Sequence, residues 1–442
     1  MNYDEFDELD ELELEPDSWQ ELQKAEKTAF VAHLVRQGET EAEVQASLEE
    51  LIRLADTAGI EVLGTYSQKR NQPERGTFFG KGFLEELSQK MLQAQAEMLI
   101  VNEELSPMQG RNIERDYSIK VIDRTEVILS IFHDHARTKE AKLQVKLAEL
   151  EYQLPRLKKL WGHFDKERGS VRSSGGSATR GMGEKQIEID KRIIKVQIKR
   201  INKAIWQITH QKLTQRKQRD KTKKICLVGY TNAGKSTLFN RLTHAGVLVE
   251  DRLFATLDST SRQLKLSTGN PLVLSDTVGF ISKLPHHLVA SFKATLMEVQ
   301  DADLLLHMVD VSDDRYAYYI EEVDKVLGQI NAENIPQILV FNKIDKLDDR
   351  FLSLLTRKFP QAAFVSAAQD LNIDTLLEMV ENRLLGNRLL KLKLPYDKAS
   401  LVSRLHDIGQ VKSEDYREDG IHLEVELGSD DHYLVEEYLD RG

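Results

Sequence analysis

The residues best suited to chemistry lie in a glycine-rich segment that follows an apolar run. Residues 224–228 read Lys-Ile-Cys-Leu-Val, and residues 229–236 fit the pattern G-x-x-x-x-G-K-[ST]. The glycines let the backbone wrap closely around phosphate oxygens, while successive N–H groups and the N-terminus of the next helix supply positive potential. A phosphate-binding loop is therefore predicted between a strand at 224–228 and a helix at 237–242.

Each polar side chain of this loop has an expected role. Lys235 reaches the β- and γ-phosphates of a bound nucleotide, and the hydroxyl of Ser236 is a ligand for Mg²⁺. Asn232 either shapes the loop or binds K⁺, as an asparagine at this position does in some related GTPases, and both interpretations stay open. The predicted phosphate-binding residues are Gly229, Tyr230, Thr231, Asn232, Ala233, Gly234, Lys235, Ser236, Thr237 and the more distant Gly279.

A second motif, D-x-x-G, follows the apolar run at residues 272–275. Asp276 can hold the Mg²⁺ shell through a water molecule, and the N–H of Gly279 can sense the γ-phosphate. This predicts a nucleotide-sensitive switch II, formed by Asp276, Thr277, Val278 and Gly279. The next residue is Phe280, where Ras-like enzymes have a water-orienting glutamine. The catalytic residue is therefore unknown, and slow intrinsic hydrolysis is expected unless a partner, a cation or a reordered loop completes the site.

A third motif, Asn342-Lys343-Ile344-Asp345, follows the apolar run at residues 338–341. The carboxylate of Asp345 can accept hydrogen bonds from guanine N1–H and the 2-amino group, an arrangement that adenine does not present. A further short strand at residues 363–365 precedes a segment suited to backbone contact with the base. The predicted guanine-binding residues are Asn342, Lys343, Asp345, Ser366, Ala367 and Ala368. GTP is therefore the predicted substrate.

Between the first two motifs, a threonine is needed to complete Mg²⁺ coordination when the γ-phosphate is present. Thr256 is the preferred candidate because polar and small residues flank it, whereas Thr260 and Ser261 stay as alternatives. Switch I is accordingly predicted at Phe254, Ala255, Thr256, Leu257 and Asp258. The predicted metal ligands are Ser236, Thr256 and, through water, Asp276.

The elements that must position these motifs alternate between strands and helices over two stretches of the chain. Such alternation predicts parallel sheets with helices packed on their faces. Apolar periodicity predicts helices at residues 41–57, 107–117 and 399–408 and a strand at residues 98–101. Residues 75–82 are Gly-rich but lack the Walker spacing, and they are either a flexible βα connection or a second phosphate or RNA contact. The sequence predicts a multidomain α/β protein with an acidic disordered tail at 1–27, an N-terminal parallel-sheet domain at 28–138, a basic helical hairpin at 139–223, a P-loop GTPase domain at 224–388 and a small α+β domain at 389–442.

Charge is unevenly distributed along this chain of 442 residues, whose net charge is −11. Residues 1–17 hold nine carboxylates and no Lys or Arg, whereas residues 139–224 hold 24 Lys or Arg against nine Asp or Glu. Apolar residues recur at three- and four-residue spacing from Lys139 to about Leu160 and from Lys185 to about Gln218. This predicts two amphipathic helices packed antiparallel. A cationic block of this kind indicates binding to a polyanion.

The connector between these helices, residues 168–183, is rich in glycine and arginine. It is either a pure linker or a tip that contacts nucleic acid through backbone N–H groups and arginines. The predicted RNA-contact residues are Arg172, Gly175, Gly176, Arg180, Gly181 and Gly183.

Composition narrows the cellular setting. Cys226 is the one cysteine of the chain, so no intrachain disulfide can form, which suits a reducing cytoplasm. No window approaches twenty consecutive apolar residues, which argues against a membrane span. The N-terminus is acidic, which argues against a secretory signal. A cytoplasmic monomer without membrane insertion is predicted.

The order and composition of the motifs resemble those of the HflX-type ribosome-binding GTPases, of the translation-factor class. The similarity lies in residues 175–188, 254–258, 276–280 and the upstream Thr57-Ala58-Gly59, and it covers roughly residues 40–390. Met182 and Ser259 stand where that family commonly has proline, which leaves the stiffness of both loops open.

The resemblance implies a GTPase that binds the large ribosomal subunit and its RNA and splits stalled ribosomes during stress. The hairpin tip would then point toward ribosomal RNA near the peptidyl-transferase region, and the N-terminal domain would be associated with ATP binding and RNA remodelling. Two other functions stay open. One is a non-ribosomal regulatory G protein whose hairpin docks a protein partner. The other is an ATP-dependent RNA-remodelling enzyme, for which residues 1–138 contain no P-loop.

Overall fold

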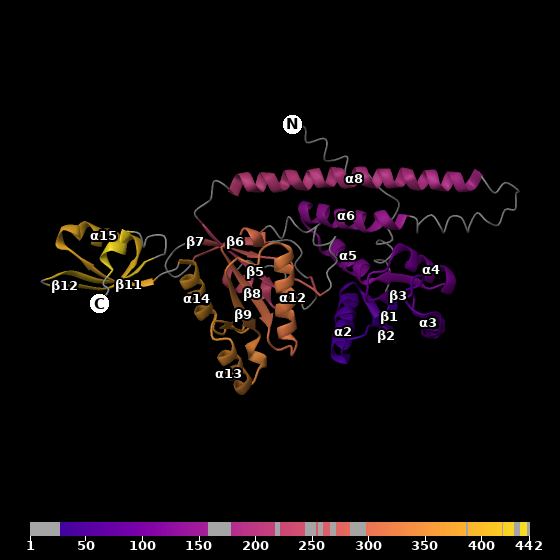
Figure 1. Ribbon diagram of the computed structural model, residues 1–442, viewed down its shortest axis with the longest axis horizontal. Helices are drawn as coiled ribbons and strands as arrows, with labels where there is room; N and C mark the ends of the chain where they lie inside the picture. Colours follow the sequence, from indigo (N-terminus) through magenta and orange to yellow (C-terminus); the bar gives the residue numbers. More distant parts are fainter. Residues whose placement is uncertain are drawn as a thin grey trace. The chain divides into compact units, whose positions relative to one another are not determined.

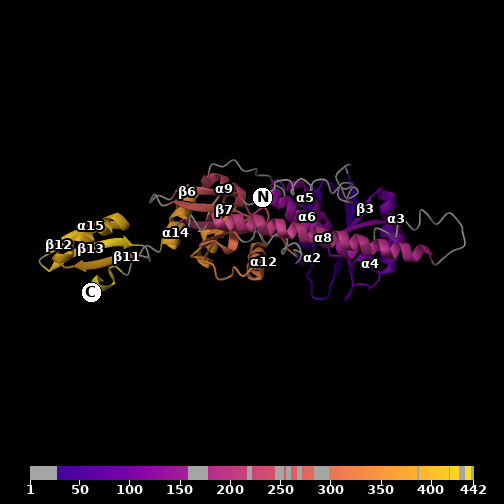
Figure 2. The ribbon, with the colours of Figure 1, turned by 90° about the horizontal axis from the view of Figure 1, so that it is seen from above.

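The chain forms two compact units. The first comprises residues 1–220, 248–259 and 277–297, and the second comprises residues 221–247, 260–276 and 298–442. Figures 1 and 2 show the helices and strands of both units from two directions. The computed structural model describes residues 27–157, 178–216, 222–243, 253–254, 260–265, 271–282, 298–385, 388–417, 419–427 and 434–439.

The sheet of the first unit has four parallel strands in the order β2-β1-β3-β4. Its strands are β1 (Lys27–Val35), β2 (Ile60–Lys69), β3 (Met98–Val101) and β4 (Lys120–Asp123). Its helices are α2 (Glu41–Thr57), α3 (Lys81–Ala94), α4 (Pro107–Tyr117) and α5 (Arg124–His135). Strands β1 and β3 are buried along nearly their whole length, as expected for a parallel sheet covered on both faces. The predicted α/β arrangement is confirmed.

Local capping sets several helix boundaries in this unit. Thr40 precedes α2 and forms a capping box with Glu43, in which each side chain bonds the other residue's backbone N–H. Asp123 caps α5 by accepting a hydrogen bond from the N–H of Glu126. Helix α5 itself is not predicted by the sequence, because apolar residues occur all around it and leave no amphipathic stripe.

Two further helices of the first unit form the predicted hairpin. They are α6 (Lys139–Gln153), continued by the 3₁₀ turn η3 (Leu154–Arg156), and α8 (Ala178–Arg216). They lie side by side in both views (Figures 1 and 2), and leucines of α6 pack against isoleucines of α8. Helix α6 gives way to this 3₁₀ turn because Pro155 has no N–H with which to continue the helical hydrogen bonds, and the predicted end near Leu160 lies outside the described residues.

Helix α8 begins at Ala178 rather than near Lys185, so the predicted connector is shorter than expected. Each residue added to a helix gains one backbone hydrogen bond, which can outweigh a cost of about 1 kcal/mol for each glycine. The predicted tip residues that lie on the helix are Arg180, Gly181 and Gly183. Those that lie outside the described residues are Arg172, Gly175 and Gly176. None of the described helices is apolar and long enough to cross a membrane.

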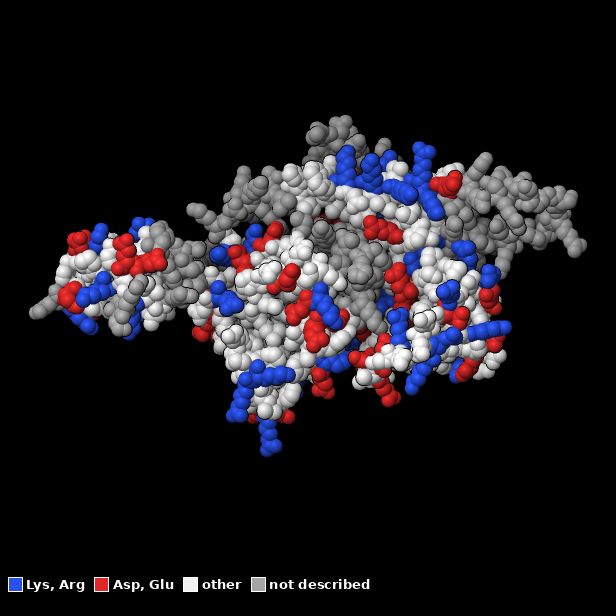
Figure 3. Space-filling model, in the orientation of Figure 1, with Lys and Arg blue, Asp and Glu red and all other residues white. Residues whose placement is uncertain are grey.

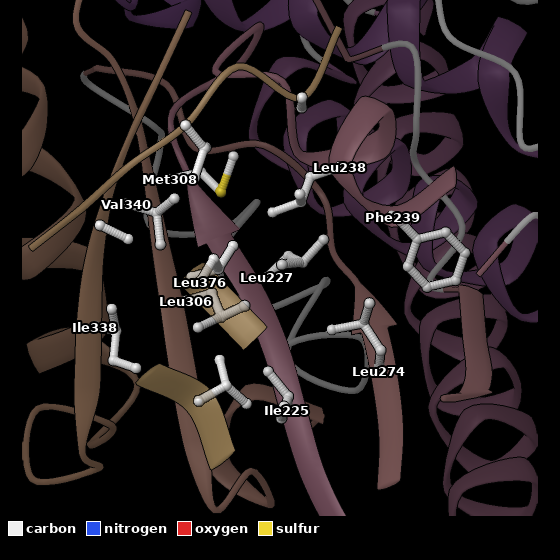
Figure 4. Packing of buried hydrophobic residues seen from close by; sticks show 14 of the residues in the cluster. Ile225, Leu227, Leu238, Phe239, Leu274, Leu306, Met308, Ile338, Val340 and Leu376 are labelled. Atoms are coloured by element: carbon white, nitrogen blue, oxygen red, sulfur yellow. The ribbon is translucent and has the colours of Figure 1, made fainter. Parts of the chain in front are cut away.

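The larger sheet of the second unit has the strand order β10-β9-β8-β5-β7-β6, in which β6 runs antiparallel to β7 and the other pairs are parallel. Its strands are β5 (Lys223–Gly229), β6 (Thr260–Lys265), β7 (Pro271–Asp276), β8 (Leu304–Asp310), β9 (Gln337–Asn342) and β10 (Ala363–Phe364). Its helices are α9 (Lys235–Thr243), α12 (Tyr316–Gln329), α13 (Asp349–Lys358) and α14 (Ile373–Leu385), with the 3₁₀ turn η6 (Ile344–Lys346). Buried residues of these strands, α9 and α14 form its core (Figure 4). The predicted parallel sheet is confirmed.

The C-terminal part of the second unit is a three-stranded antiparallel sheet in the order β11-β13-β12. Its elements are β11 (Arg388–Leu394), η7 (Tyr396–Lys398), α15 (Ala399–Ile408), β12 (Gln410–Arg417), β13 (Gly420–Leu427) and η9 (Glu436–Tyr438). Val402 and Leu405 of α15 pack with Leu392 and Leu423 of the sheet, which confirms the predicted small α+β domain. Strand β12 is not predicted, because its exposed residues show no apolar alternation.

Candidate nucleotide-binding site

The glycine spacing of the phosphate loop is set by how closely neighbouring strands approach it. Gly229 ends β5 with a φ of 151°, and Gly234 has a φ of 90°, values that residues with a side chain rarely adopt. A Cβ on Gly229 would lie 2.3 Å from the carbonyl oxygen of Met308, and one on Gly234 would lie 2.1 Å from Nδ2 of Asn342. Glycine is therefore required at both positions of the motif.

Lys235 is the buried cation of this loop. It begins α9 at 6% exposure, and its Nζ donates hydrogen bonds to the carbonyl oxygens of Tyr230 (2.8 Å) and Gly229 (3.1 Å). Burial lowers the pKa of its ammonium group from 10.5 to about 8, while the carboxylate of Asp276 acts in the opposite direction. An anionic phosphate would favour the charged form again, as expected for the role predicted for Lys235.

Two oxygen groups meet where a magnesium ion is expected. The hydroxyl of Ser236 donates a hydrogen bond to Oδ2 of Asp276 at 2.6 Å, and Asp276 is fully buried at the end of β7. A hydroxyl and a carboxylate are oxygen donors that Mg²⁺ prefers, so the residues present fit the ion. The members of predicted switch I that lie outside the described residues are Ala255, Thr256, Leu257 and Asp258.

The alternatives to Thr256 as a metal ligand both lie in β6. Thr260 is directly opposite Asp276 in the antiparallel register, whereas Ser261 is opposite Ser275. The hydroxyls of Ser261 and Ser275 are hydrogen-bonded to each other at 2.8 Å. Thr260 is therefore the alternative that is nearer to the predicted ligands, and Thr256 stays a prediction.

Asn342 joins the phosphate loop to the guanine-binding segments. Its Nδ2 donates a hydrogen bond to the carbonyl oxygen of Ala233 (2.9 Å), and its Oδ1 accepts one from the N–H of Ala367 (3.0 Å). The residue is 2% exposed, so both bonds are shielded from water. Three motifs that are distant in the sequence thus meet through one side-chain amide. The sequence does not predict this role, and a direct contact of Asn342 with the base stays a prediction.

Lys343 and Asp345 meet partners that lie outside the motifs. Lys343 has a left-handed φ of 66°, and its Nζ lies 2.6 Å from Oδ2 of Asp310 at the end of β8. Nε2 of Gln369 lies 3.4 Å from Oδ2 of Asp345. A signal for Asp310 exists in the sequence, because it ends a strand of the parallel sheet, and ligand-binding residues gather at such ends. No comparable signal marks Gln369.

The residues that follow D-x-x-G pack within the first compact unit. Phe280 is 3% exposed, in keeping with the absence of a water-orienting side chain at this position. The carbonyl oxygen of Ser282 accepts a hydrogen bond from Nη2 of Arg124 (3.1 Å), and its hydroxyl donates to Glu50. Arg124 and Glu50 form an ion pair at 2.8 Å. No sequence pattern predicts this cluster, because its members are far apart along the chain.

The described part of switch I rests on the same helix of the first unit. Phe254 has a φ of 58° and is 3% exposed. Its ring meets Phe132 of α5 edge-on, with centroids 4.7 Å apart. Because Arg124 is the first residue of α5, this one helix contacts residues at or next to both predicted switches.

Family models match three successive stretches of the chain. They describe a GTP-binding GTPase N-terminal region at residues 45–133, a GTP-binding GTPase Middle Region at residues 135–219 and a 50S ribosome-binding GTPase at residues 224–343. Their order is that of the N-terminal sheet, the helical hairpin and the nucleotide-binding sheet.

Curated relatives match nearly the whole chain. It is 41% identical over 414 residues to the GTPase HflX of Caldanaerobacter subterraneus subsp. tengcongensis, covering 93% of each chain. It is 40% identical over 387 residues to the GTPase HflX of Escherichia coli, covering 86% of this chain and 89% of that one. A solved GTP-binding protein from Sulfolobus solfataricus in complex with GDP is 25% identical, covers 81% of this chain and 98% of that chain, and superposes with a TM-score of 0.42.

Proposed function

The chain belongs to the HflX family of GTPases, and we propose that it uses GTP to control its association with the large ribosomal subunit. The resemblance inferred from its motifs is confirmed by identity to these relatives over most of its length. It hydrolyses GTP to GDP and phosphate, and its nucleotide-binding domain is that of a ribosome-binding GTPase. The finer proposal is that it splits stalled ribosomes during stress, as a cytoplasmic, ribosome-associated monomer.

The observation that carries this proposal is the exposed cationic face of α8. Between Lys191 and Gln211 this helix has six Lys or Arg and no Asp or Glu. Figure 3 shows Lys and Arg side chains gathered along it. Ribosomal RNA offers phosphates at high density, and neutralising them releases counterions, so such a face binds RNA strongly at low salt. The predicted tip residues would extend the same contact.

Residues of the predicted motifs would hold the nucleotide that controls the switch. Lys235 and the loop N–H groups bind the β- and γ-phosphates, and Asp345 selects guanine. Ser236 and Asp276, with Thr256, would hold Mg²⁺, which neutralises phosphate charge when bound. The γ-phosphate fixes the segment around Gly279, and its loss on hydrolysis frees that segment. GTP can therefore favour the ribosome-binding conformation only through the γ-phosphate contacts that GDP lacks.

The proposal is tested by sedimenting purified ribosomes with the protein, in the presence of a non-hydrolysable GTP analogue or of GDP. We expect at least about tenfold tighter association with the analogue. Sucrose gradients of intact ribosomes then show whether free subunits accumulate with GTP. Equal co-sedimentation in both nucleotide states would remove the switch from the proposal.

The same experiment separates the two other functions. Association that resists both RNase and high salt would favour a regulatory G protein that docks a protein partner, because phosphate contacts weaken steeply with salt. RNA remodelling that depends on ATP and persists in Lys235→Ala would favour a motor in the N-terminal domain.

K⁺ is the remaining cofactor proposal. Asn232 adopts a left-handed φ of 62°, a conformation that asparagine tolerates well and that by itself accounts for loop shaping. If Asn232 also binds K⁺, replacing K⁺ by Na⁺ lowers kcat for GTP hydrolysis. A rate independent of the cation leaves loop shaping as its role.

A further inference from the structure

The negative charge of the chain is concentrated at its N-terminus. Residues 1–26 contain eleven carboxylates and one lysine, a net charge of −10 in a chain whose total is −11. Residues 27–138 carry −5 and residues 225–442 carry −11, whereas residues 139–224 carry +15. The N-terminal segment is therefore repelled by most of the protein and attracted to the helical hairpin.

Helix α8 has two faces of different character. Ile194 and Ile201 are each 5% exposed and pack with Leu147 and Leu150 of α6. The opposite face is exposed, and its cations alternate with apolar side chains instead of forming a uniform charged surface. The exposed apolar residues are Ile189 (49%), Ile193 (41%), Val196 (45%) and Trp206 (63%). The exposed cations are Arg192, Lys195, Lys199, Arg200 and Lys203.

This exposed face of α8 suits a partner that is both anionic and apolar. Ile189, Ile193 and Val196 follow i, i+4, i+7 spacing and form a continuous stripe between the cations. Trp206 stacks on His210 with ring centroids 5.0 Å apart and an interplanar angle of 8°, which adds a flat aromatic surface. A phosphate backbone satisfies the cations but leaves the aliphatic stripe uncovered.

The N-terminal segment has the complementary pattern. Its carboxylates are interleaved with apolar residues, four of which follow a strict three-residue spacing. These four residues are Tyr3, Phe6, Leu9 and Leu12. The segment can therefore bring carboxylates to the cations and apolar groups to the stripe at the same time.

The segment is also long enough to reach α8. It is attached at Lys27, the first residue of β1, and belongs to the same compact unit as α8. Twenty-six residues span up to about 90 Å when extended, and the 39 residues of α8 form a helix about 60 Å long. Attachment gives the segment an effective concentration in about the millimolar range, so a weak ionic contact is enough to hold it in place.

We propose that residues 1–26 dock on the exposed face of α8 and compete there with RNA phosphates, so that the chain carries its own anionic competitor. Docking alone does not depend on the proposed ribosomal function, whereas its effect on RNA binding does. RNA that binds tightly, through many phosphates at once, displaces the segment. Isolated or short RNA does not displace the segment, so the segment lowers the affinity of the protein for such RNA.

Docking is tested on the full chain with a zero-length carbodiimide reagent, which joins carboxylates to lysines in direct contact. We expect cross-links from residues 1–26 to Lys195, Lys199 and Lys203, lost at high salt. Lys81 is the internal control, because it lies in the same unit and its side chain is 82% exposed. Cross-links to Lys81 as frequent as those to α8, or links that join two chains into a dimer, would overturn the proposal.

Competition is tested with a short single-stranded RNA, comparing the full chain with a variant lacking residues 2–17 and one in which they are a Gly/Ser segment of equal length. If the segment occupies the face nine-tenths of the time, both variants bind the RNA about tenfold more tightly at low salt. The advantage disappears at high salt. GTP affinity is unchanged in both, which shows that the second unit is intact. Equal RNA affinity of all three chains at low salt, with the cross-links present, would leave docking in place and overturn the competition.

Discussion

The carboxyl ends of the two parallel sheets are filled in opposite ways. In the second unit, the loop after β5 approaches β8 and β9 so closely that Gly229 and Gly234 have no room for a Cβ. Backbone groups therefore come close together at this edge, beside the side chains of Asp276, Asp310 and Asn342, and the loop N–H groups are expected to bind phosphates. In the first unit, the corresponding edge is filled by polar side chains that bond one another.

Two linked groups of side chains fill the edge of the first unit. Nη1 of Arg124 donates to Asn102 (3.2 Å), whose own amide donates to Ser47 (2.8 Å). Next to Arg124, the carboxylate of Asp123 accepts hydrogen bonds from the N–H of Leu105 and the hydroxyl of Tyr152. Burial raises the pKa of Asp123, although Arg156 acts in the opposite direction.

We infer from these two sheets that a parallel strand order alone does not make a nucleotide site. Both sheets bring polar residues to one edge, as parallel strands do. A site for phosphates also needs backbone N–H groups that the fold leaves for a ligand. Where polar side chains bond one another instead, as around Asn102 and Arg124, the edge stabilises the domain.

Lys235→Ala tests whether the phosphate loop of the second unit holds the nucleotide. Removing two charge-assisted phosphate contacts of about 1.5–3 kcal/mol each should weaken GTP binding about 100-fold or more. The fold should persist, because the substitution removes a buried charge. Nucleotide titration measures the first effect and far-UV circular dichroism the second. Retained GTP binding would show that phosphates are held elsewhere.

In the first unit, Arg124→Met should have the opposite outcome, a loss of stability with little change in nucleotide affinity. It leaves Glu50 without its buried partner, so the free energy of unfolding of this unit should fall by about 3–5 kcal/mol. GDP affinity should stay within about twofold, because the phosphate loop and the guanine-binding residues lie in the second unit. Urea denaturation and GDP titration measure the two quantities. Arg115→Met is the matched control, because its pair with Asp116 is exposed and should contribute little.

Asp345→Asn tests whether this carboxylate selects the base. Loss of the paired acceptors should weaken GTP binding about 10- to 100-fold and admit xanthosine triphosphate. Asp348→Asn is the control, since Asp348 caps α13 through the N–H of Phe351 and should not affect base choice. Competition between the two nucleotides provides the measurement. Unchanged preference for GTP in Asp345→Asn would mean that another group reads the base.

The smallest expected effect concerns pH. The pKa of Lys235 is about 8 in the folded protein, compared with its ordinary value of 10.5 in the unfolded chain. Between pH 8 and pH 10.5 folding therefore releases a proton, and the free energy of unfolding rises with pH. Bound GTP should favour the protonated form of Lys235, so GTP binding above pH 8 takes up a proton. The affinity for GTP should therefore fall by up to about tenfold per pH unit above pH 8. Calorimetry in buffers of different ionisation enthalpy measures the uptake. Binding without proton uptake at pH 8.5–9, an interval set by that pKa, would contradict the buried cation.

Features whose signals are local follow from the order of residues alone. The predicted bounds of α2, β3, α4 and α15 agree with the structure, because periodicity and turn residues act within a few positions. The phosphate loop and the Asn-Lys-x-Asp element were likewise readable as contiguous patterns. Where the local signal was absent, as in α5, whose apolar residues form one short run without helical periodicity, and in the exposed β12, the prediction missed the element.

Which distant residues meet depends on how the chain folds as a whole. Asn342 reaches Ala233 across 109 residues, and Ser282 reaches Glu50 across 232. Lys343 meets Asp310 because Lys343 directly follows β9 and Asp310 ends β8, and these two strands are neighbours in the sheet. Strand order is fixed by how all the elements bury their apolar faces together, and no local pattern along the chain encodes that result.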